Sequence, residues 1–142
     1  MLLTIRPRAA LGLALCVAAL PGCGHAYSSV KSAAAAEVSV PGADRFAPFI
    51  TEVPHGSQVT FYNGDRDAHT VVSVPGDALA LHLLLKPGQR ATVTVDASGI
   101  HRFYCSIHAH YDAKTGQIAA NPNADHPDEP MEGVIAVPAR SG

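Results

Sequence analysis

The sequence has few cysteines, few basic residues and no long apolar segment. Charged residues make up only 15% of the 142 residues, and 10 Lys and Arg are opposed by 12 Asp and Glu. Without a basic excess the chain has little to attract nucleic acid, so we expect no nucleic-acid partner. The apolar stretch from Ala9 to Leu20 is too short to cross a bilayer as a helix. The length and the 47% hydrophobic content predict one domain around a single core, and we expect a monomer.

The first 22 residues have the layout of a secretory signal. Arg6 and Arg8 precede the apolar stretch, which ends in Leu20-Pro21-Gly22-Cys23. This ending resembles a bacterial lipobox, which implies cleavage before Cys23, acylation of that cysteine and attachment to a membrane. Ordinary cleavage near Ala26 or among residues 33–36 is the alternative. Both predict an exported domain, either periplasmic or anchored so that it faces the periplasm or the cell exterior.

The rest of the chain divides into a tether, a domain and a tail. Residues 23–37 are rich in Ala and Ser and lack a usable apolar face, which predicts a flexible tether. The domain is expected over residues 38–138, and the tail over 139–142. Removal of the signal lowers Lys plus Arg from 10 to 8 against 12 acidic residues, which gives a formal net charge of −4.

The three cysteines fall into different parts of this division. Cys16 lies inside the signal and Cys23 begins the tether, so Cys105 is alone in the domain and has no disulfide partner there. An unpaired thiol in an oxidising compartment is a liability unless something binds it. A metal ion would protect it.

Short β-type segments separated by turn residues run through the domain. In two of them, Gln58–Tyr62 and Ala91–Val95, apolar and polar residues alternate, which gives each strand one buried face. The sequence therefore predicts an all-β fold, an antiparallel sandwich with little place for helix. The expected strands are Glu37–Val40, Phe49–Val53, Gln58–Tyr62, Thr70–Val74, Leu79–Leu85, Ala91–Val95, His101–Cys105 and Gly133–Val137.

Residues 109–130 interrupt this pattern. They are polar, contain Gly, Asn, Pro and Asp turn signals, and predict a long loop insertion with no strand of its own. A loop of this length in a compact domain is usually functional or disordered. The insertion carries His110, Asp112, Asp125 and His126. It either holds a second, weaker metal ion, shields a metal site at Cys105, or carries these side chains for solubility alone.

Cys105 and His108 stand three residues apart at the end of a predicted strand. This spacing lets both side chains reach one metal ion while the backbone turns away. A thiolate and an imidazole together favour copper over hard cations. The pair alone is weak evidence, because a buried thiol beside a hydrogen-bonded histidine has the same spacing.

Five motifs follow one another along the domain. They are Phe46-x-Pro48, then Val59-Thr60-Phe61-Tyr62-Asn63-x-Asp65 leading to His69-Thr70-Val71, then Leu85-x-Pro87-Gly88, then Gly99-x-x-x-Phe103-Tyr104-Cys105-Ser106-x-His108, and finally Met131-x-Gly133-x-Ile135-x-Val137. Together they resemble the successive signatures of the cupredoxin family, to which plastocyanin and azurin belong. The resemblance implies a Greek-key β-sandwich over residues 38–138 that binds one type 1 copper ion.

The resemblance also implies which residues bind the metal. His69 and His108 would supply imidazoles, Cys105 a thiolate and Met131 a weak axial thioether, the arrangement of a blue copper site. Asn63 would tie the loop before His69 to the cysteine segment by hydrogen bonds, although Asn63-Gly64 is equally a turn signal.

Met131 departs from the family pattern in its spacing. Members usually place this Met a few residues after the histidine, whereas here residues 109–130 intervene. The Met-x-Gly-x-Ile-x-Val run nevertheless matches the entry into the last strand, so the insertion can bulge outward while both of its ends stay fixed. A backbone oxygen or His110 is the alternative axial ligand.

The other polar groups have simpler interpretations. Two clusters of acidic residues could form a docking surface for a basic redox partner. We favour the simpler interpretation that they are solvated charges on loops. The remaining histidines are interpreted as tether, surface or hydrogen-bonded residues. The clusters are Asp65/Asp67 and Asp125/Asp128/Glu129/Glu132, and the histidines are His25, His55, His82 and His101.

Four protein ligands would fill the copper site and leave no open position for a substrate. The sequence therefore favours single-electron transfer outside the cytoplasm, with redox proteins as partners, over an enzyme. The alternative function is copper binding for tolerance or delivery, with the insertion capturing the metal.

Overall fold

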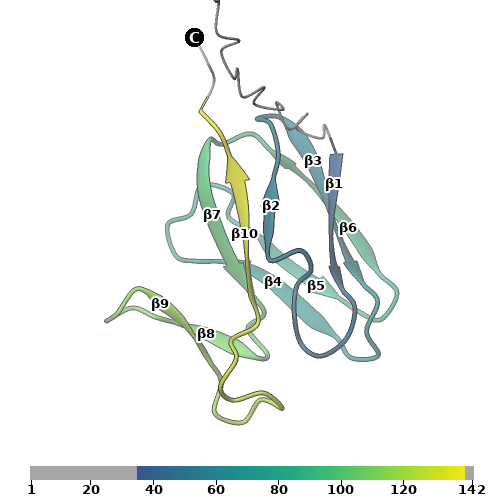
Figure 1. Cartoon of the computed structure of the whole chain (residues 1–142), viewed down its shortest axis with the longest axis vertical. Helices are drawn as coiled ribbons and strands as arrows, with labels where there is room; N and C mark the ends of the chain where they lie inside the picture. Colours follow the sequence, from purple (N-terminus) through teal and green to yellow (C-terminus); the bar gives the residue numbers. More distant parts are fainter. Residues whose placement is uncertain (1–34, 140–142) are drawn as a thin grey trace, which may run out of the picture.

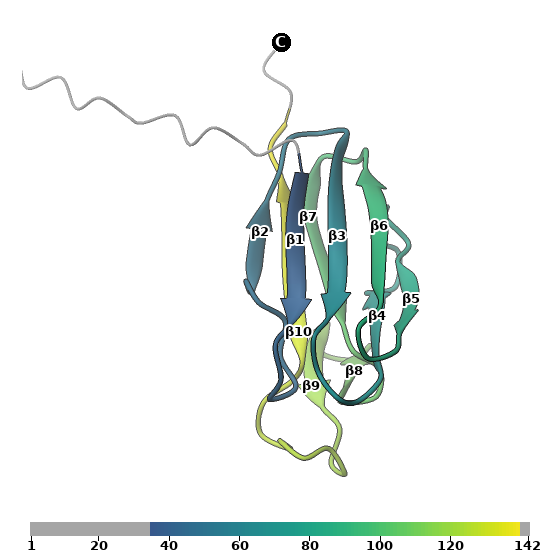
Figure 2. The same cartoon turned by 90° about the vertical axis from the view of Figure 1, so that its right-hand side faces the viewer.

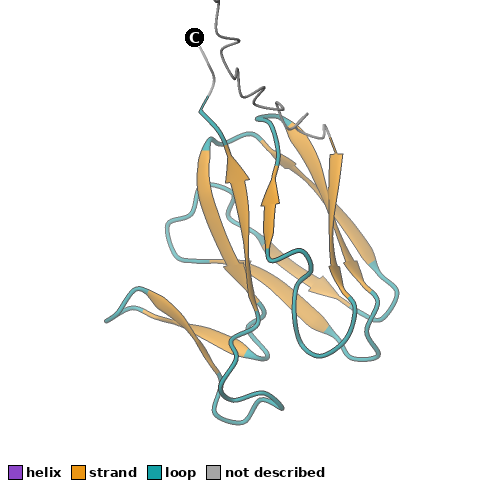
Figure 3. Cartoon of the chain, viewed as in Figure 1, coloured by secondary structure: helices purple, strands orange, loops and turns teal. Residues whose placement is uncertain are grey.

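The computed structural model of the chain describes residues 35–139. Within this range it contains strands and loops but no helix, as Figure 3 shows, and so no helix that could span a membrane. All eight expected strands are present, and the predicted all-β class is confirmed. The signal, Cys23 and most of the tether lie outside the described residues. The strands are β1 (Ala35–Val40), β2 (Ile50–Glu52), β3 (Ser57–Asn63), β4 (His69–Ser73), β5 (His82–Leu85), β6 (Arg90–Val95), β7 (Gly99–Tyr104), β8 (Ala109–Asp112), β9 (Gln117–Ala120) and β10 (Glu132–Val137) (Figure 1).

Two stacked sheets form the body of the domain. One has the strand order β1-β3-β6 and the other the order β2-β10-β7-β4-β5. Figure 2 shows the three-stranded sheet in front of the five-stranded one. From β1 to β7, every connection except that between β4 and β5 passes from one sheet to the other. Segments distant in the sequence thus meet at the two ends of the sandwich.

The expected antiparallel pairing is found in most of the sandwich, but it is wrong for two strand pairs. β1 runs parallel to β3, with Ala35 opposite Gln58, and β2 runs parallel to β10, with Ile50 opposite Val134. Alternation of apolar and polar residues shows which face of a strand is buried, but it does not show the direction of the neighbouring strand. Each of these parallel pairs joins strands that are not adjacent in the sequence.

The alternating side chains meet in one core between the sheets. Phe103 is at its centre and makes edge-to-face contacts with Phe46 and Phe61, with ring centroids 5.0 and 5.3 Å apart. Such aromatic pairs stabilise a core beyond the area that they bury. Gly133 lies opposite Phe103 on β10, and a Cβ there would come within 2.4 Å of the Phe103 ring. The core residues are Val38, Val40, Phe46, Val53, Val59, Phe61, Val71, Leu81, Leu85, Val95, Phe103, Cys105, Met131, Ile135 and Val137.

The strand boundaries differ from the predictions by up to three residues, and two of these differences have a structural reason. β1 begins at Ala35, so residues 35–37 of the predicted tether belong to the sheet, where backbone pairing with β3 compensates for their weak apolar pattern. β5 begins at His82 rather than at Leu79. The carboxylate of Asp77 accepts the Leu79 N–H at 2.9 Å and so holds the preceding residues in a turn.

The insertion was predicted to have no strand, and this prediction is wrong. It contains the two-stranded sheet β8-β9, which lies at the end of the sandwich opposite the one where β10 ends (Figures 1 and 2). Asp112 organises its turn, because the Asp112 carboxylate accepts hydrogen bonds from the Lys114 N–H and the Thr115 hydroxyl. Gly116 adopts φ 70°, which favours glycine. Polar composition obscured this hairpin, since each strand has only four residues and just one buried side chain, Ala109 in β8 and Ile118 in β9.

Candidate metal centre

The start of β4 and the end of β7 bring together the side chains of His69, Cys105 and His108. Because β4 and β7 are antiparallel neighbours, with Val72 opposite Tyr104, the first residue of β4 lies beside the segment that follows β7. One potential ligand atom from each of the three side chains lies within 4.8 Å of the other two. The Cys105 Sγ is 3.4 Å from the Nδ1 of His108 and 3.9 Å from the Nδ1 of His69.

A tight turn after β7 orients two of these side chains. The carbonyl of Cys105 accepts the N–H groups of His108 and Ala109 at 3.1 and 2.8 Å. The backbone therefore turns away while the side chains of Cys105 and His108 remain together, as their spacing predicts. The rings of His69 and His108 have their centroids 5.1 Å apart. The three groups are close enough to share one metal ion.

Exposure distinguishes the members of this group. Cys105 and His69 are fully buried, whereas 12% of the His108 side chain is exposed. Ile107, the residue before His108, is about half exposed. The imidazole of His108 is therefore the part of the group that reaches the surface.

Hydrogen bonds favour the thiolate form of Cys105. Burial raises the pKa of this thiol, but hydrogen bonds with His69 and Thr70 outweigh burial and lower the pKa to about 6. The Thr70 N–H donates to the Cys105 Sγ at 3.3 Å, and the Thr70 hydroxyl donates at 3.6 Å. Since the thiolate is the form of cysteine that binds metals, the site is prepared for a cation.

His69 has acceptors on both sides of its ring. Burial lowers the pKa of this imidazole, but hydrogen bonds to Cys105 and Asp65 together raise it above its ordinary value. The Nε2 of His69 is 3.1 Å from the Asp65 carboxylate. The pKa of Asp65 is lowered, first by the Arg66 N–H that its carboxylate accepts and further by His69.

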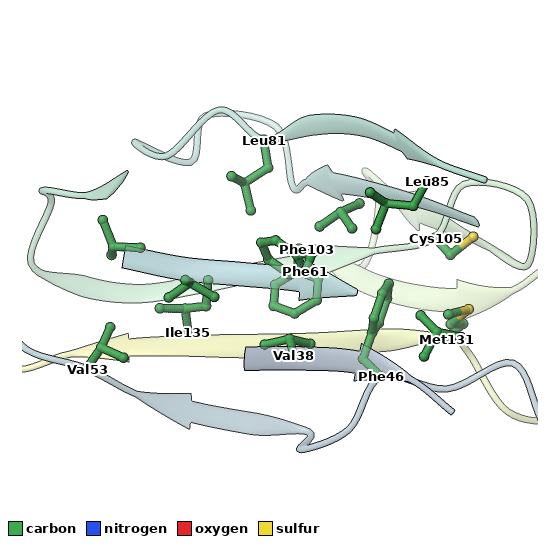
Figure 4. Close-up of a cluster of buried hydrophobic side chains, with 14 of the residues drawn as sticks. Val38, Phe46, Val53, Phe61, Leu81, Leu85, Phe103, Cys105, Met131 and Ile135 are labelled. Atoms are coloured by element: carbon green, nitrogen blue, oxygen red, sulfur yellow. The ribbon is translucent and has the colours of Figure 1, made fainter. Parts of the chain in front are cut away.

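Met131 lies at the same end of the core as Cys105. The Met131 carbonyl accepts the Cys105 N–H at 3.0 Å, which extends the pairing of β7 with β10 by one step. Figure 4 shows the sulfur atoms of Cys105 and Met131 at this end of the core. Met131 is buried. The Cys105–Met131 hydrogen bond also shows that the chain segments before and after the long insertion lie side by side. Two imidazoles, a thiolate and a thioether form a soft donor set that suits copper.

Asn63 was predicted to join the loop before His69 to the cysteine segment by hydrogen bonds. In the structure Thr70 makes this connection instead. The Asn63 amide donates to the carbonyls of Asp67 and Leu85 at 2.7 and 2.9 Å, and its oxygen accepts the Asp65 N–H at 2.9 Å. Both amide protons are thus used within the loop and on β5. Asn63 shapes the turn before His69, the other role suggested by the sequence.

Thr70 makes the tie because β4 lies beside the segment that follows β7. The Thr70 hydroxyl accepts the Ser106 N–H at 2.7 Å and shares a hydrogen bond with the Ser106 hydroxyl at 2.9 Å. The sequence could have indicated a role for Thr70 only by its position next to His69. The pairing of β4 with β7 is what shows that Thr70 faces Ser106.

The insertion holds the ligand-bearing turn through Asn121, a residue that sequence analysis did not identify. The Asn121 amide donates to the carbonyls of Ile107 and Ser106 at 2.9 and 3.3 Å, and its backbone N–H donates to the carbonyl of His108 at 2.8 Å. Its amide oxygen lies 2.9 Å from the Nδ1 of His110. The only indication of Asn121 in the sequence was the turn signal of the Asn-Pro pair that follows the hairpin.

The remaining candidates serve other roles in the described range. His101 is buried, with Nδ1 3.0 Å from the Asp77 carboxylate and Nε2 2.9 Å from the Ala97 carbonyl, as expected of a hydrogen-bonded histidine. His82 is exposed and His55 half-buried. His25 lies outside the described residues.

No second metal site forms in the insertion as the structure describes it. Across residues 35–139, the only groups with three or more suitable side chains in reach of one ion are His69-Cys105-His108 and Asp44-Asp65-His69. The insertion contributes to neither of them. His110 instead faces Asn121, and Asp112 forms the hairpin turn.

Comparisons with known proteins connect the chain to copper proteins. A plastocyanin from Sambucus nigra is 36% identical over an alignment of 78 residues, and the match covers 47% of this chain and 79% of that protein. The reduced state of an amicyanin mutant has 20% identity and a TM-score of 0.53, and the match covers 73% of this chain and 82% of amicyanin. A Cu-containing nitrite reductase from Thermus scotoductus SA-01 has 22% identity and a TM-score of 0.52, over 75% of this chain but only 23% of the reductase. At these identities the two solved structures share the fold. No protein-family model matches the chain.

Proposed function

Because the chain belongs to the cupredoxin family, the family of plastocyanin, we propose that it is a type 1 copper protein that transfers single electrons outside the cytoplasm. The observation that carries this proposal is the gathering of His69, Cys105 and His108 within 4.8 Å at one end of the sandwich. The predicted copper cofactor suits these side chains.

Four side chains would hold the ion. The Nδ1 atoms of His69 and His108 and the thiolate of Cys105 would be the strong ligands, and Met131, buried at the same end of the core, would add its thioether. When bound, copper supplies a one-electron couple between Cu(I) and Cu(II). The chain supplies donors that are fixed by two sheets and by the hydrogen bonds of Thr70 and Asn121, so the site changes little between oxidation states.

The exposed edge of His108 is the proposed route for the electron. Cys105, His69 and Met131 are buried, whereas His108 reaches the surface beside Ile107. A redox protein that docks over Ile107 would approach the site more closely there than across either sheet. Because protein ligands would fill the metal site, no position is left for a substrate. This supports an electron carrier rather than an enzyme.

Export of the domain follows from the signal-like first 22 residues, and the cysteine at position 23 is the proposed site of lipid attachment. Loss of membrane retention in Cys23→Ala would support the anchor, and unchanged retention would exclude it.

Reversible reduction is the test of the proposed function. The copper-loaded protein should accept one electron per chain and return it on reoxidation, with full recovery of its visible absorption. A protein that binds copper but loses it on reduction would act in copper storage or delivery, the function that the sequence left as an alternative.

A further inference from the structure

Each of the two histidines that face Cys105 has a carboxylate at the far side of its ring. The Nε2 of His69 is 3.1 Å from an Asp65 oxygen, and the Nε2 of His108 is 3.5 Å from an Asp44 oxygen. We propose that Asp65 and Asp44 are positioning residues that fix the two imidazoles and stabilise the oxidised copper site. This inference rests on the proposed function.

The chemistry of the imidazole ring explains how these two carboxylates can affect a bound copper ion. Both rings turn Nδ1 toward the Cys105 sulfur. A neutral imidazole that binds a metal through Nδ1 carries its proton on Nε2 and can donate it. A carboxylate that accepts this proton fixes the tautomer and the ring plane, and it makes the ring a stronger donor. A stronger donor and a nearby negative charge both favour Cu(II) over Cu(I).

The backbone holds Asp65 in place for this role. The Asp65 N–H donates to the Asn63 side chain at 2.9 Å, and the carboxylate accepts the Arg66 N–H at 2.6 Å through the oxygen that does not face His69. One carboxylate oxygen is therefore anchored to the loop while the other faces the ring. Asp65 is more than an exposed loop charge, which is how the sequence alone was interpreted.

Asp44 reaches the site from the connection between β1 and β2. Ala43 and Asp44 both have positive φ, 57° and 46°, in the left-handed region that non-glycine residues rarely adopt. Residues held in this region are usually fixed by their surroundings. The side chain of Asp44 is 13% exposed, and its carboxylate lies beside the Nε2 of His108, whose side chain is 12% exposed. The proposed exit for the electron is thus an imidazole paired with a carboxylate.

Substitution by Asn and by Ala separates charge from hydrogen bonding. Asp65→Asn keeps an acceptor for His69 but removes the charge, and Asp65→Ala removes both. Asp67→Asn is the matched control, because it removes an equal charge from an exposed side chain two residues away. Partners of metal-bound histidines typically contribute about 10–100-fold to metal affinity.

We expect Asp65→Ala to lower Cu(II) affinity by about 10–100-fold, with a smaller loss of Cu(I) affinity. Each tenfold fall in the ratio of these affinities raises the one-electron potential by about 59 mV. Asp65→Asn should raise the potential less, and Asp44→Asn should raise it through His108. Potentials of these variants equal to that of Asp67→Asn would overturn the proposal.

Two further measurements use the unaltered chain. In the Cu(I) form, nitrogen-15 NMR should show protons on the Nε2 atoms of His69 and His108, with slow exchange for His69; a proton on Nδ1 would overturn the proposal. Metal analysis with excess zinc or copper should show one ion per chain. A second ion that is lost in Asp44→Asn would mean that the two carboxylates serve another cation. Failure to bind any copper would contradict the proposed function itself, whereas copper binding with unchanged potentials would contradict only the roles of Asp44 and Asp65.

Discussion

The backbone N–H of Thr70 donates to the sulfur of Cys105 across a distance of 3.3 Å, from the strand beside the one that ends at the cysteine. This contact joins the first histidine segment to the thiol, and it is one of the reasons why the pKa of Cys105 falls to about 6 against the penalty of burial. Two consequences of this contact can be measured on the metal-free protein.

The thiol of the metal-free protein should deprotonate near pH 6, as followed by the ultraviolet absorption of the thiolate. Thr70→Val removes the hydroxyl that donates to the sulfur and should move this midpoint upward, whereas Thr92→Val on β6 should leave it unchanged. An unaltered midpoint in Thr70→Val would show that the hydroxyl does not stabilise the thiolate.

The same shift predicts a pH dependence of stability. Between pH 6 and the ordinary thiol pKa of 9.0, the unfolded chain holds more protons on Cys105 than the folded chain does, so this residue makes the free energy of unfolding rise with pH. The stability difference between the metal-free wild type and metal-free Thr70→Val should therefore widen across this interval. Urea unfolding at several pH values measures it, and a constant difference would contradict the assigned cause.

Replacement of Met131 should change the potential in opposite directions according to the substitute. Gln offers a harder oxygen donor that favours Cu(II), so Met131→Gln should lower the potential; Met131→Leu fills a similar volume without a donor and should raise it. Voltammetry and visible spectra measure both. If both variants match the wild type, then Met131 is not the axial ligand.

Asn121 should stabilise the turn that carries His108. Asn121→Ala removes side-chain hydrogen bonds to two carbonyls of that turn and should lower the free energy of unfolding by about 1–2 kcal/mol. It should also broaden the paramagnetic resonance spectrum of the copper form, because His108 is held less firmly. Asn123→Ala, an exposed residue in the same insertion, is the control. A normal spectrum in Asn121→Ala would show that the insertion does not support the site.

Gly133 should tolerate no side chain while Phe103 keeps its place. A Cβ at this position meets the ring at 2.4 Å, so Gly133→Ala should destabilise the domain by about 1–3 kcal/mol in urea unfolding. Phe103→Leu in the same chain should relieve part of this cost. Strictly additive effects of the two substitutions would mean that the ring is not the obstacle.

The sequence predicted the parts of this protein that depend on short patterns. β-type segments between turn residues located the strands, and the spacing of Cys105 and His108 predicted side chains that the turn after β7 does hold together. Pairing between distant strands was not predictable in this way. The parallel neighbours of β1 and β2, the contact of Thr70 with Ser106 and the approach of Asp44 to His108 all depend on which strands meet at one end of the sandwich.

The insertion shows a second limit of sequence patterns. Its polar, turn-rich composition hid a hairpin, because β8 and β9 have only four residues each and bury only Ala109 and Ile118. A second metal ion was one of the roles left open for its histidines, whereas His110 lies in hydrogen-bonding distance of Asn121, whose amide supports the neighbouring turn. The sequence could indicate that this segment was unusual, but only its contacts show what it holds.

The optical and paramagnetic resonance spectra of the Cu(II)-loaded protein test the central claim most directly. We predict an intense visible thiolate-to-copper absorption with one copper ion per chain, lost in Cys105→Ser and altered in His69→Ala and His108→Ala. A spectrum without such absorption, or one that survives in Cys105→Ser, would contradict the account.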